Sequence, residues 1–244
     1  MPGAQSFSQV GDHLGIVLLH GFTGSPAAVR PWAQYLADAG HTVIAPRLPG
    51  HGTRWQDLNL TTWTDWYTEA ERSVAWLGRH ATSIVAMGIS TGATMALRLA
   101  EEHDVIRGVV GVNPIIQTER RDRRYLTSLY SVLGSLPNLN DDIKRPGVSE
   151  HAYDRVPLRA AYSLTRMWAA TKSDIDQVRV PVLLYRSADD HVAEPSNTVW
   201  LMANLETERE EVLLQDSFHV ATLDNDAHTI FTGSERFARE VSQP

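Results

Sequence analysis

Short runs of apolar residues alternate with amphipathic stretches over most of the chain. An apolar run of about four to eight residues bounded by turn residues is typical of a strand buried on both faces of a sheet. Such runs predict strands at residues 15–19, 41–46, 83–87, 105–112 and 181–186, with a more alternating strand at 210–215. Strands that alternate with helices predict an α/β fold, in which helices flank a mostly parallel sheet.

Helical spacing of apolar residues predicts helices at residues 25–40, 62–78, 93–102, 197–205 and 224–240. Ser25-Pro26 places a preferred N-cap residue before a proline at the first helical position. Residues 62–65 have the form of a capping box. Three tryptophans follow in that helix, and we expect them to pack in the core rather than to form an aromatic binding platform: Trp63, Trp66 and Trp76.

The alternation stops between residues 115 and 180, where no buried strand is evident. Connections of this length are usually functional or disordered, but this one carries aromatic residues and helix formers, among them Tyr125, Leu129, Tyr130, Tyr162 and Trp168. We therefore expect a small, mainly helical cap insertion at approximately residues 115–165, with apolar residues that face the active site. Two ordinary surface helices are the alternative.

The composition is typical of a globular protein and argues against several other classes of protein. The chain has 244 residues, of which 43% are hydrophobic and 21% charged, and we expect residues 1–244 to form a single domain. The absence of cysteine excludes disulfides and cysteine nucleophiles, and a net charge of −7 argues against nucleic-acid binding. We see neither a signal peptide nor a membrane-spanning run, so a cytoplasmic location is the expectation.

The strongest candidate for chemistry is the pentapeptide Gly88-Ile89-Ser90-Thr91-Gly92, between a predicted strand and a predicted helix. A serine in this G-x-S-x-G context sits on a tight turn that lifts its hydroxyl above the sheet edge. The next backbone N–H and the helix N-terminus then face any negative charge that forms there. The pattern alone is weak, because a glycine-rich turn with an incidental serine would also match it.

Two further candidates follow predicted strands in chain order: an aspartate, either Asp189 or Asp190, and then His219. Ser, Asp, His is the order of an α/β-hydrolase triad. All three follow the carboxyl ends of parallel strands, where their side chains can meet. His219 would take the proton of Ser90 and later protonate the leaving alkoxide, and the aspartate would orient the imidazole.

The oxyanion that forms during acyl transfer needs preorganised donors. We expect these to be the backbone N–H groups of Phe22, in the loop of residues 20–24, and of Thr91, with His20 bracing the loop. The turn Asp189-Asp190-His191 could suggest a metal site. Neighbouring side chains on a turn point apart, however, so we expect no metal there, and no cofactor.

The segments His20-Gly21-Phe22-Thr23-Gly24, Gly88 to Gly92 and, most specifically, Ser217 to Asp224 resemble the bacterial monoacylglycerol lipases and the related small carboxylesterases of the α/β-hydrolase family. The resemblance covers nearly the whole chain. It implies an α/β-hydrolase fold and assigns the triad carboxylate to Asp190, with Asp189 as the fallback. The chain departs from the family pattern at Thr91 and Ala93 of the elbow, and at Glu194, where a proline is common.

The resemblance also implies that Glu150, in the cap, helps to hold the glycerol hydroxyls of the substrate, although a solvated surface glutamate is the alternative. The predicted function is a serine ester hydrolase that cleaves monoacylglycerols to glycerol and fatty acid through an acyl-enzyme on Ser90. A general carboxylesterase for short- to medium-chain esters is the first alternative, and a binding protein on a hydrolase scaffold the second. Expected partners are the ester substrate and, transiently, a lipid interface touched by the cap.

Overall fold

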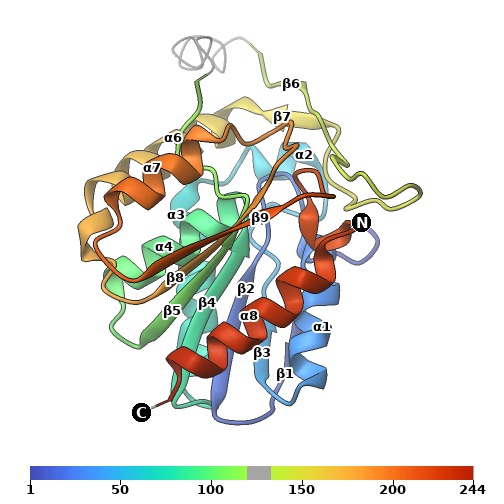
Figure 1. Cartoon of the computed structure of the whole chain (residues 1–244). Helices are drawn as coiled ribbons and strands as arrows, with labels where there is room; N and C mark the ends of the chain where they lie inside the picture. The colour runs from blue at the N-terminus through green and yellow to red at the C-terminus, as the bar shows by residue number, and fades with distance from the viewer. Residues whose placement is uncertain (120–132, 244) are drawn as a thin grey trace.

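A seven-stranded sheet forms the centre of the molecule (Figure 1). The computed structural model describes residues 1–119 and 133–243. The strand order is β1-β3-β2-β4-β5-β8-β9, and all neighbours are parallel except β1 and β3. The strands are β1 (Phe7–Gln9), β2 (Leu14–Leu19), β3 (Thr42–Ala45), β4 (Ser83–Ile89), β5 (Ile106–Val112), β8 (Val182–Ser187) and β9 (Arg209–Leu214). The predicted mostly parallel sheet is confirmed.

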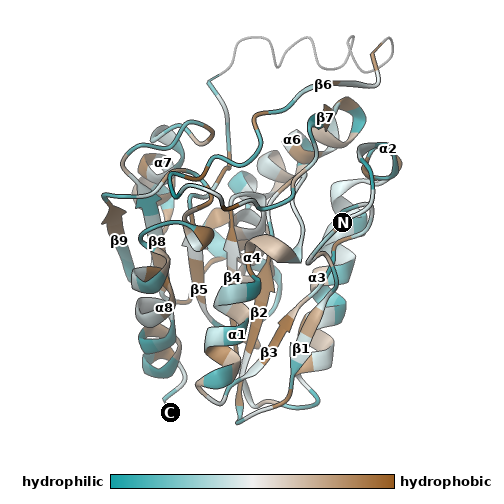
Figure 2. Ribbon diagram, turned by 90° about the vertical axis from the view of Figure 1, so that its right-hand side faces the viewer, coloured by the Kyte–Doolittle hydropathy of each residue, from teal (hydrophilic) through white to brown (hydrophobic). Residues whose placement is uncertain are grey.

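Helices cover both faces of this sheet. One face carries α1 (Arg30–Asp38) and α8 (Ala227–Val241); the other carries α3 (Trp63–Leu77), α4 (Thr91–Glu102), α6 (Leu158–Ser173) and α7 (Ser196–Asn204). Strand β2 serves both layers because successive side chains point to opposite faces: Ile16 and Leu18 pack with α1, and Val17 and Leu19 with α3. Figure 2 shows the apolar strands enclosed between helices of mixed hydropathy. None of the described helices has the length and apolar character of a membrane span.

The edge strand β1 was not evident from the hydrophobic pattern. It has three residues, none of them fully buried, and it pairs antiparallel with β3. A strand of three residues is too short to show an apolar run, and Phe7 is the only one of the three that is partly buried against the core. The four-residue helix α2 (Trp55–Leu58) was missed for a similar reason, since it is too short to show helical spacing.

The helix predicted to start at Ser25-Pro26 is divided in two. Ser25 caps a short 3₁₀ helix (Pro26–Ala28), where its hydroxyl accepts the backbone N–H of Ala27, and α1 then begins at Arg30. Pro31 explains the division, because a proline has no N–H to donate to a carbonyl one turn back and is tolerated only in the first turn of a helix. The N-cap signal was therefore correct, but it marked the shorter element.

Helix α3 begins and packs as predicted. The Asp65 carboxylate accepts a hydrogen bond of 2.8 Å from the backbone N–H of Thr62, as expected of a capping box. Trp66 is fully buried, and Trp63 and Trp76 pack against the same core cluster. The expectation that these tryptophans belong to the core is confirmed.

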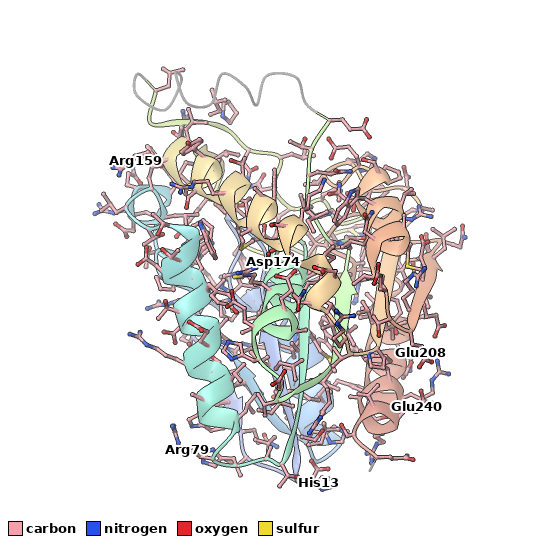
Figure 3. The ribbon with its side chains drawn as sticks, turned by 90° about the vertical axis from the view of Figure 1, so that its left-hand side faces the viewer. His13, Arg79, Arg159, Asp174, Glu208 and Glu240 are labelled. Carbon is pink, nitrogen blue, oxygen red and sulfur yellow. The ribbon has the colours of Figure 1, made fainter. Side chains whose placement is uncertain are left out.

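The described residues between β5 and β8 include a segment, residues 133–157, that lies over the carboxyl ends of the strands (Figures 1 and 3). The chain between β5 and β8 contains a two-stranded antiparallel sheet of β6 (Ser135–Pro137) and β7 (Arg155–Pro157), an irregular segment between them, and α6, whose ends are marked by Arg159 and Asp174 in Figure 3. Helix α6 runs past residue 165, to Ser173. The described part is less helical than predicted, because side-chain hydrogen bonds to the loops below hold residues 138–154. Tyr125, Leu129 and Tyr130 lie outside the described residues.

The parallel arrangement brings four strand ends to one edge of the sheet. Strand β2 ends at Leu19, just before the loop of residues 20–24, and β4 ends at Ile89, just before Ser90. Strands β8 and β9 end shortly before Asp190 and His219. Residues that are far apart in the sequence therefore follow neighbouring strands, as the rule for ligand sites in open α/β sheets requires.

Candidate active site

Ser90 sits on a strained turn between β4 and α4. Its backbone has φ 56° and ψ −121°, a conformation that costs an L-residue about 1–3 kcal/mol. A Cβ on Gly88 would lie 2.3 Å from the carbonyl carbon of Gly92, and a Cβ on Gly92 would lie 2.0 Å from the carbonyl oxygen of Leu19. Neither position admits a larger residue, so backbone contacts dictate the spacing of the G-x-S-x-G motif.

The imidazole of His219 is hydrogen-bonded to Asp190. Its Nδ1 lies 2.8 Å and 3.1 Å from the two carboxylate oxygens of Asp190. Oδ1 of Asp190 also accepts the backbone N–H groups of Val192 and Ala193, each at 2.8 Å. The side chain of Asp189, in contrast, is 65% exposed. Because Nδ1 of His219 donates to the carboxylate, Nε2 is left free to accept a proton.

Charge governs the protonation of this pair. Burial raises the pKa of Asp190, but the adjacent His219 and backbone N–H groups outweigh burial and hold that pKa below its usual value. Burial lowers the pKa of His219, yet Asp190, Glu150 and Asp142 together raise it above 6.5. An ionised carboxylate therefore stabilises the imidazolium that forms when the ring takes up a proton.

The loop of residues 20–24 passes directly beside Ser90, since a Cβ on Gly21 would lie 3.3 Å from the Cβ of Ser90. The buried His20 holds this loop: Nε2 accepts the backbone N–H of Leu48 at 3.2 Å, and Nδ1 donates to the carbonyl of Gly21 at 3.0 Å. Burial lowers the pKa of His20 to about 4. The ring is therefore neutral, as a nitrogen that accepts an N–H must be.

Two backbone N–H groups lie where oxyanion donors are expected. Thr91 is the first residue of α4, so its N–H is among those that have no partner within the helix. Phe22 follows Gly21 in the loop beside Ser90, and both Phe22 and Thr91 line the same pocket as Ser90. The positive end of the α4 dipole adds to the attraction for negative charge at this point.

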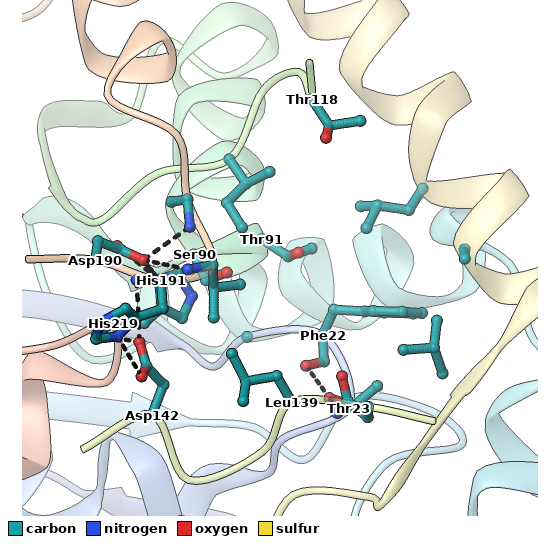
Figure 4. A pocket seen from close by; sticks show the side chains of 18 of the residues that line it. Phe22, Thr23, Ser90, Thr91, Thr118, Leu139, Asp142, Asp190, His191 and His219 are labelled. Carbon is teal, nitrogen blue, oxygen red and sulfur yellow. Dashed lines mark hydrogen bonds and ion pairs between the residues drawn. The ribbon is translucent and has the colours of Figure 1, made fainter. Parts of the chain in front are cut away.

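One cavity of about 660 Å³ connects these residues. Ser90, Asp190 and His219 all line it, and Figure 4 shows Asp190 and His219 together at one side of the pocket, with Phe22 across from them. Helix α6 and its surroundings contribute an apolar wall: Ile115, Leu136, Val156, Leu158, Ala161, Leu164 and Trp168. An apolar wall beside a polar cluster suits a substrate that has a hydrocarbon chain and a polar head.

Glu150 contributes a carboxylate to the wall of this pocket. Its Oε2 faces the loop of residues 20–24, because a Cβ on Gly24 would lie 3.2 Å from it, and its backbone N–H donates to Asp141 at 2.8 Å. Burial raises the pKa of Glu150 to about 7, against the opposing charge of His219. Glu150 is thus half-buried at the site rather than a solvated surface residue.

Within the described ranges, one group of side chains brings its ligand atoms close enough to hold a metal ion: Glu71, Glu102 and His103. None of these residues lines the pocket, and the Glu102 carboxylate already accepts the hydroxyl of Tyr67 at 2.6 Å. In the acidic turn, Asp190 turns to His219 while Asp189 is exposed. That turn therefore does not gather its side chains around one point.

Two residues that hold the site were not identified from the sequence. Asn113, at the end of β5, has φ 45°, and its side chain bonds the carbonyl of His219 at 2.7 Å and the backbone N–H of Ser187 at 2.7 Å. Asp142, between β6 and β7, accepts the backbone N–H of His219 at 3.0 Å and bonds the ring of His191 at 2.8 Å. The available signal was the Asn113-Pro114 turn after a predicted strand, and such a turn does not indicate a partner across the fold.

Comparisons with known proteins agree with this geometry. A family model described as the alpha/beta hydrolase family matches residues 16–240. The chain is 37% identical over 242 residues to a thermostable monoacylglycerol lipase of Bacillus sp. (strain H-257), across 97% of this chain and 95% of that protein. It is 26% identical over 241 residues to a carboxylesterase of Bacillus subtilis (strain 168), across 96% of each.

Solved structures extend the similarity to the whole backbone. A structure reported for the metagenome-derived lipolytic enzymes LipS and LipT superposes with a TM-score of 0.95 at 33% identity, covering 98% of this chain and 99% of that one. The resemblance inferred from the motifs is therefore confirmed. With a family model matched along nearly its full length and the predicted sheet topology in place, this chain belongs to the α/β-hydrolase family.

Proposed function

We propose that this protein is a serine ester hydrolase that cleaves monoacylglycerols to glycerol and fatty acid. The observation that carries the proposal is a single pocket lined by Ser90, the hydrogen-bonded pair of Asp190 and His219, an apolar wall and the half-buried carboxylate of Glu150. The similarity to a relative named thermostable monoacylglycerol lipase supports the choice of substrate.

The proposed reaction proceeds through an acyl-enzyme. His219 takes the proton of the Ser90 hydroxyl through Nε2, and the serine oxygen attacks the ester carbonyl. The same nitrogen then protonates the departing glycerol oxygen, and in the second half it activates the water that releases the fatty acid. Asp190 keeps the proton on Nδ1 of His219 and stabilises the imidazolium, in line with their 2.8 Å contact.

Each tetrahedral intermediate places a negative charge on the former carbonyl oxygen. We assign its donors to the backbone N–H groups of Phe22 and Thr91, on the loop beside Ser90 and at the start of α4. Removing one such donor typically lowers kcat by about 100- to 1000-fold. Backbone donors are already in place before the reaction, so no reorganisation is required as the charge develops.

Glu150 is the proposed site for the glycerol head. An ionised carboxylate can accept hydrogen bonds from two hydroxyl groups at once, and this one faces the loop of residues 20–24 within the pocket. Because its pKa is raised to about 7, this acceptor is fully charged only above neutral pH. The acyl chain would then lie against the apolar wall from α6, represented by Leu158, Leu164 and Trp168.

The proposal is tested by comparing kcat/KM on monoacylglycerols with that on simple alkyl esters of equal acyl length. We expect a preference for the glycerol ester that Glu150→Gln removes, with little effect of that variant on the alkyl ester. Diacyl- and triacylglycerols in the same panel test the limit set by a pocket of about 660 Å³. Ser90→Ala is the control, and a full esterase rate in that variant would refute the mechanism.

A general carboxylesterase is the second candidate, and the similarity to the carboxylesterase of Bacillus subtilis supports it. A carboxylesterase requires the same triad and the same oxyanion donors, so variants that lose the triad do not distinguish it from a monoacylglycerol lipase. Equal kcat/KM on glycerol and alkyl esters, unchanged by Glu150→Gln, would favour the carboxylesterase. That result would leave the roles of Ser90, Asp190 and His219 intact.

We also propose that residues 115–165 act as a cap that touches a lipid interface transiently. Leu139 supports this, because its side chain is 60% exposed and yet lines the pocket. Leu133, 43% exposed, precedes β6 in the same cap. Sedimentation with phospholipid vesicles should recover less Leu139→Ser protein than wild type. Equal recovery of the two proteins would contradict this role.

A further inference from the structure

Asp142 is an unusual residue for its position in the fold. It lies in the irregular segment between β6 and β7, outside the central sheet, yet it is only 9% exposed. Its near neighbours Lys144 and Arg145 are exposed. A buried carboxylate is costly unless hydrogen-bond donors surround it, so its partners explain why it is there.

Those partners belong to two different loops of the active site. Oδ2 of Asp142 accepts the backbone N–H of His219 at 3.0 Å and that of His191 at 3.3 Å, and Oδ1 bonds Nδ1 of His191 at 2.8 Å. Its backbone carbonyl accepts the N–H of Val220 at 3.0 Å. One residue therefore joins the loop that carries Asp190 to the loop that carries His219, as the dashed lines around Asp142 in Figure 4 show.

We propose that Asp142, held by His191, is a positioning residue for His219. By binding the backbone of both loops at once, it sets the distance between Asp190 and the imidazole and thereby the alignment of the ring with Ser90. The proposal rests on the catalytic role proposed for His219. It makes the segment between β6 and β7 part of the catalytic apparatus, and not only a cover over the pocket.

The charges around the two histidines fit this role. The groups that face His219 are Asp190, Glu150 and Asp142, and all three favour its protonated form. The groups that face His191 are Asp142, Asp189 and Asp190. The hydrogen bond to Asp142 raises the pKa of His191, and the ring of Phe218 packs edge-on against it at 4.5 Å. His191 is thereby kept in place as a donor to Asp142, although its side chain is 47% exposed.

A second aspartate provides a matched control. Asp224 is also buried and anchors the same segment to the same loop, because it accepts the backbone N–H groups of Lys144, Arg145 and Phe218 at 2.7, 2.9 and 2.9 Å. Its carboxylate bonds neither His219 nor Asp190: on that loop it reaches Phe218, one residue before His219. We therefore expect Asp224→Asn to weaken the anchoring of the segment while the donors to the Asp142 carboxylate stay in place.

The experiment measures kcat and KM between pH 5 and 9 on a soluble aryl ester, which does not need the glycerol site, together with the melting temperature. We expect Asp142→Asn to lower kcat by about 10- to 100-fold, as a displacement of about 1 Å would, with KM nearly unchanged. The acid limb of the profile should move to lower pH, because one of the three carboxylates that raise the pKa of His219 is gone. Asp224→Asn should lower the melting temperature but leave the acid limb where it is.

The inference is overturned if Asp142→Asn retains the wild-type kcat and acid limb, or if Asp224→Asn reproduces both of its changes. Should Asp142→Asn fail to fold, His191→Gln decides, because this half-exposed side chain can be changed without disturbing the core. A fall in kcat of about threefold or more, with KM unchanged, is expected, and a wild-type kcat contradicts the proposal. A wild-type protein without esterase activity would instead refute the proposed function, which separates the two failures.

Discussion

Two buried histidines belong to the loops around Ser90, and their surroundings are opposite. His20, the first residue of the loop of residues 20–24, is fully buried and its ring bonds two uncharged backbone groups, and burial lowers its pKa to about 4. His219 is also buried, but the carboxylates of Asp190, Glu150 and Asp142 outweigh burial and raise its pKa above 6.5. One ring is built to stay neutral, and the other to accept a proton.

The difference extends to how each side of the site is held. On the side of His20, steric contacts and hydrogen bonds between uncharged groups position the backbone: Gly21 lies against Ser90, and Gly92 against the carbonyl of Leu19. On the side of His219, charged and polar side chains reach across the fold. The positions of the groups on the side of His20 therefore depend on how closely the backbone packs, and the position of His219 depends on charged and polar side chains. Substitutions should accordingly damage the two sides in different ways.

The largest effect is expected at Asp190. Asp190→Asn removes the charge that stabilises the imidazolium and offers an amide to Nδ1 of His219, which favours the wrong tautomer. Because the equivalent change lowers kcat by about 10⁴-fold in serine proteases, we expect a loss of that order here. Single-turnover and steady-state rates on an aryl ester, with circular dichroism to verify folding, measure it. Full activity of a natively folded Asp190→Asn protein would mean that His219 does not need the charge of Asp190.

On the side held by steric contacts, we expect Gly92→Ala to reduce the stability of the fold. The added Cβ would lie 2.0 Å from the carbonyl oxygen of Leu19, and such backbone overlap should lower the free energy of unfolding by more than about 4 kcal/mol. Gly78→Ala is the matched control, because Gly78 has helical dihedrals and its Cβ would make ordinary contacts of 3.6 Å. Urea unfolding of both variants decides; equal stability would contradict the steric account.

The smallest effect concerns pH, and it distinguishes the two histidines directly. The pKa of His20 is about 4 in the folded chain against 6.5 in an ordinary environment, so the unfolded chain binds the proton more readily between these values. Stability from this residue is fully present above pH 6.5 and is lost as the pH falls towards 4, by about 3 kcal/mol in total. Urea unfolding of wild type and His20→Gln from pH 7.5 to 4 should show a stability difference that changes by this amount; a constant difference would contradict the assignment.

For His219 the expected pKa shift is opposite to that of His20, and it should appear in the pH dependence of activity. Because the pKa of His219 is raised, its neutral form, which accepts the serine proton, is lost as the pH falls through a value above 6.5. We therefore expect the acid limb of kcat/KM above pH 6.5, at a pH where His20 still contributes its full stability. An acid limb well below 6.5 would show that burial dominates at His219 as it does at His20.

Local signals in the sequence were sufficient for the parallel strands of the sheet, the elbow and the chain order of the three candidate residues. Buried parallel strands require continuous apolar runs, and a strained strand-to-helix turn requires glycines at Gly88 and Gly92, so both leave a pattern within a few residues. The choice between Asp189 and Asp190 needed more, because neighbouring residues on a turn share the same local pattern. The resemblance to known lipases pointed to Asp190, and the 2.8 Å contact with His219 agrees with it.

By itself, then, the sequence determined the parallel sheet, the edge at which the chemistry gathers and the residue types that meet there. Only the tertiary structure decided how the His219 side is held. Asn113 and Asp142 bond to His219 from 106 and 77 residues away in the chain. The physical reason is that an apolar strand or a glycine turn is specified by its neighbours in sequence, whereas a buried carboxylate is specified by donors that only folding brings to it.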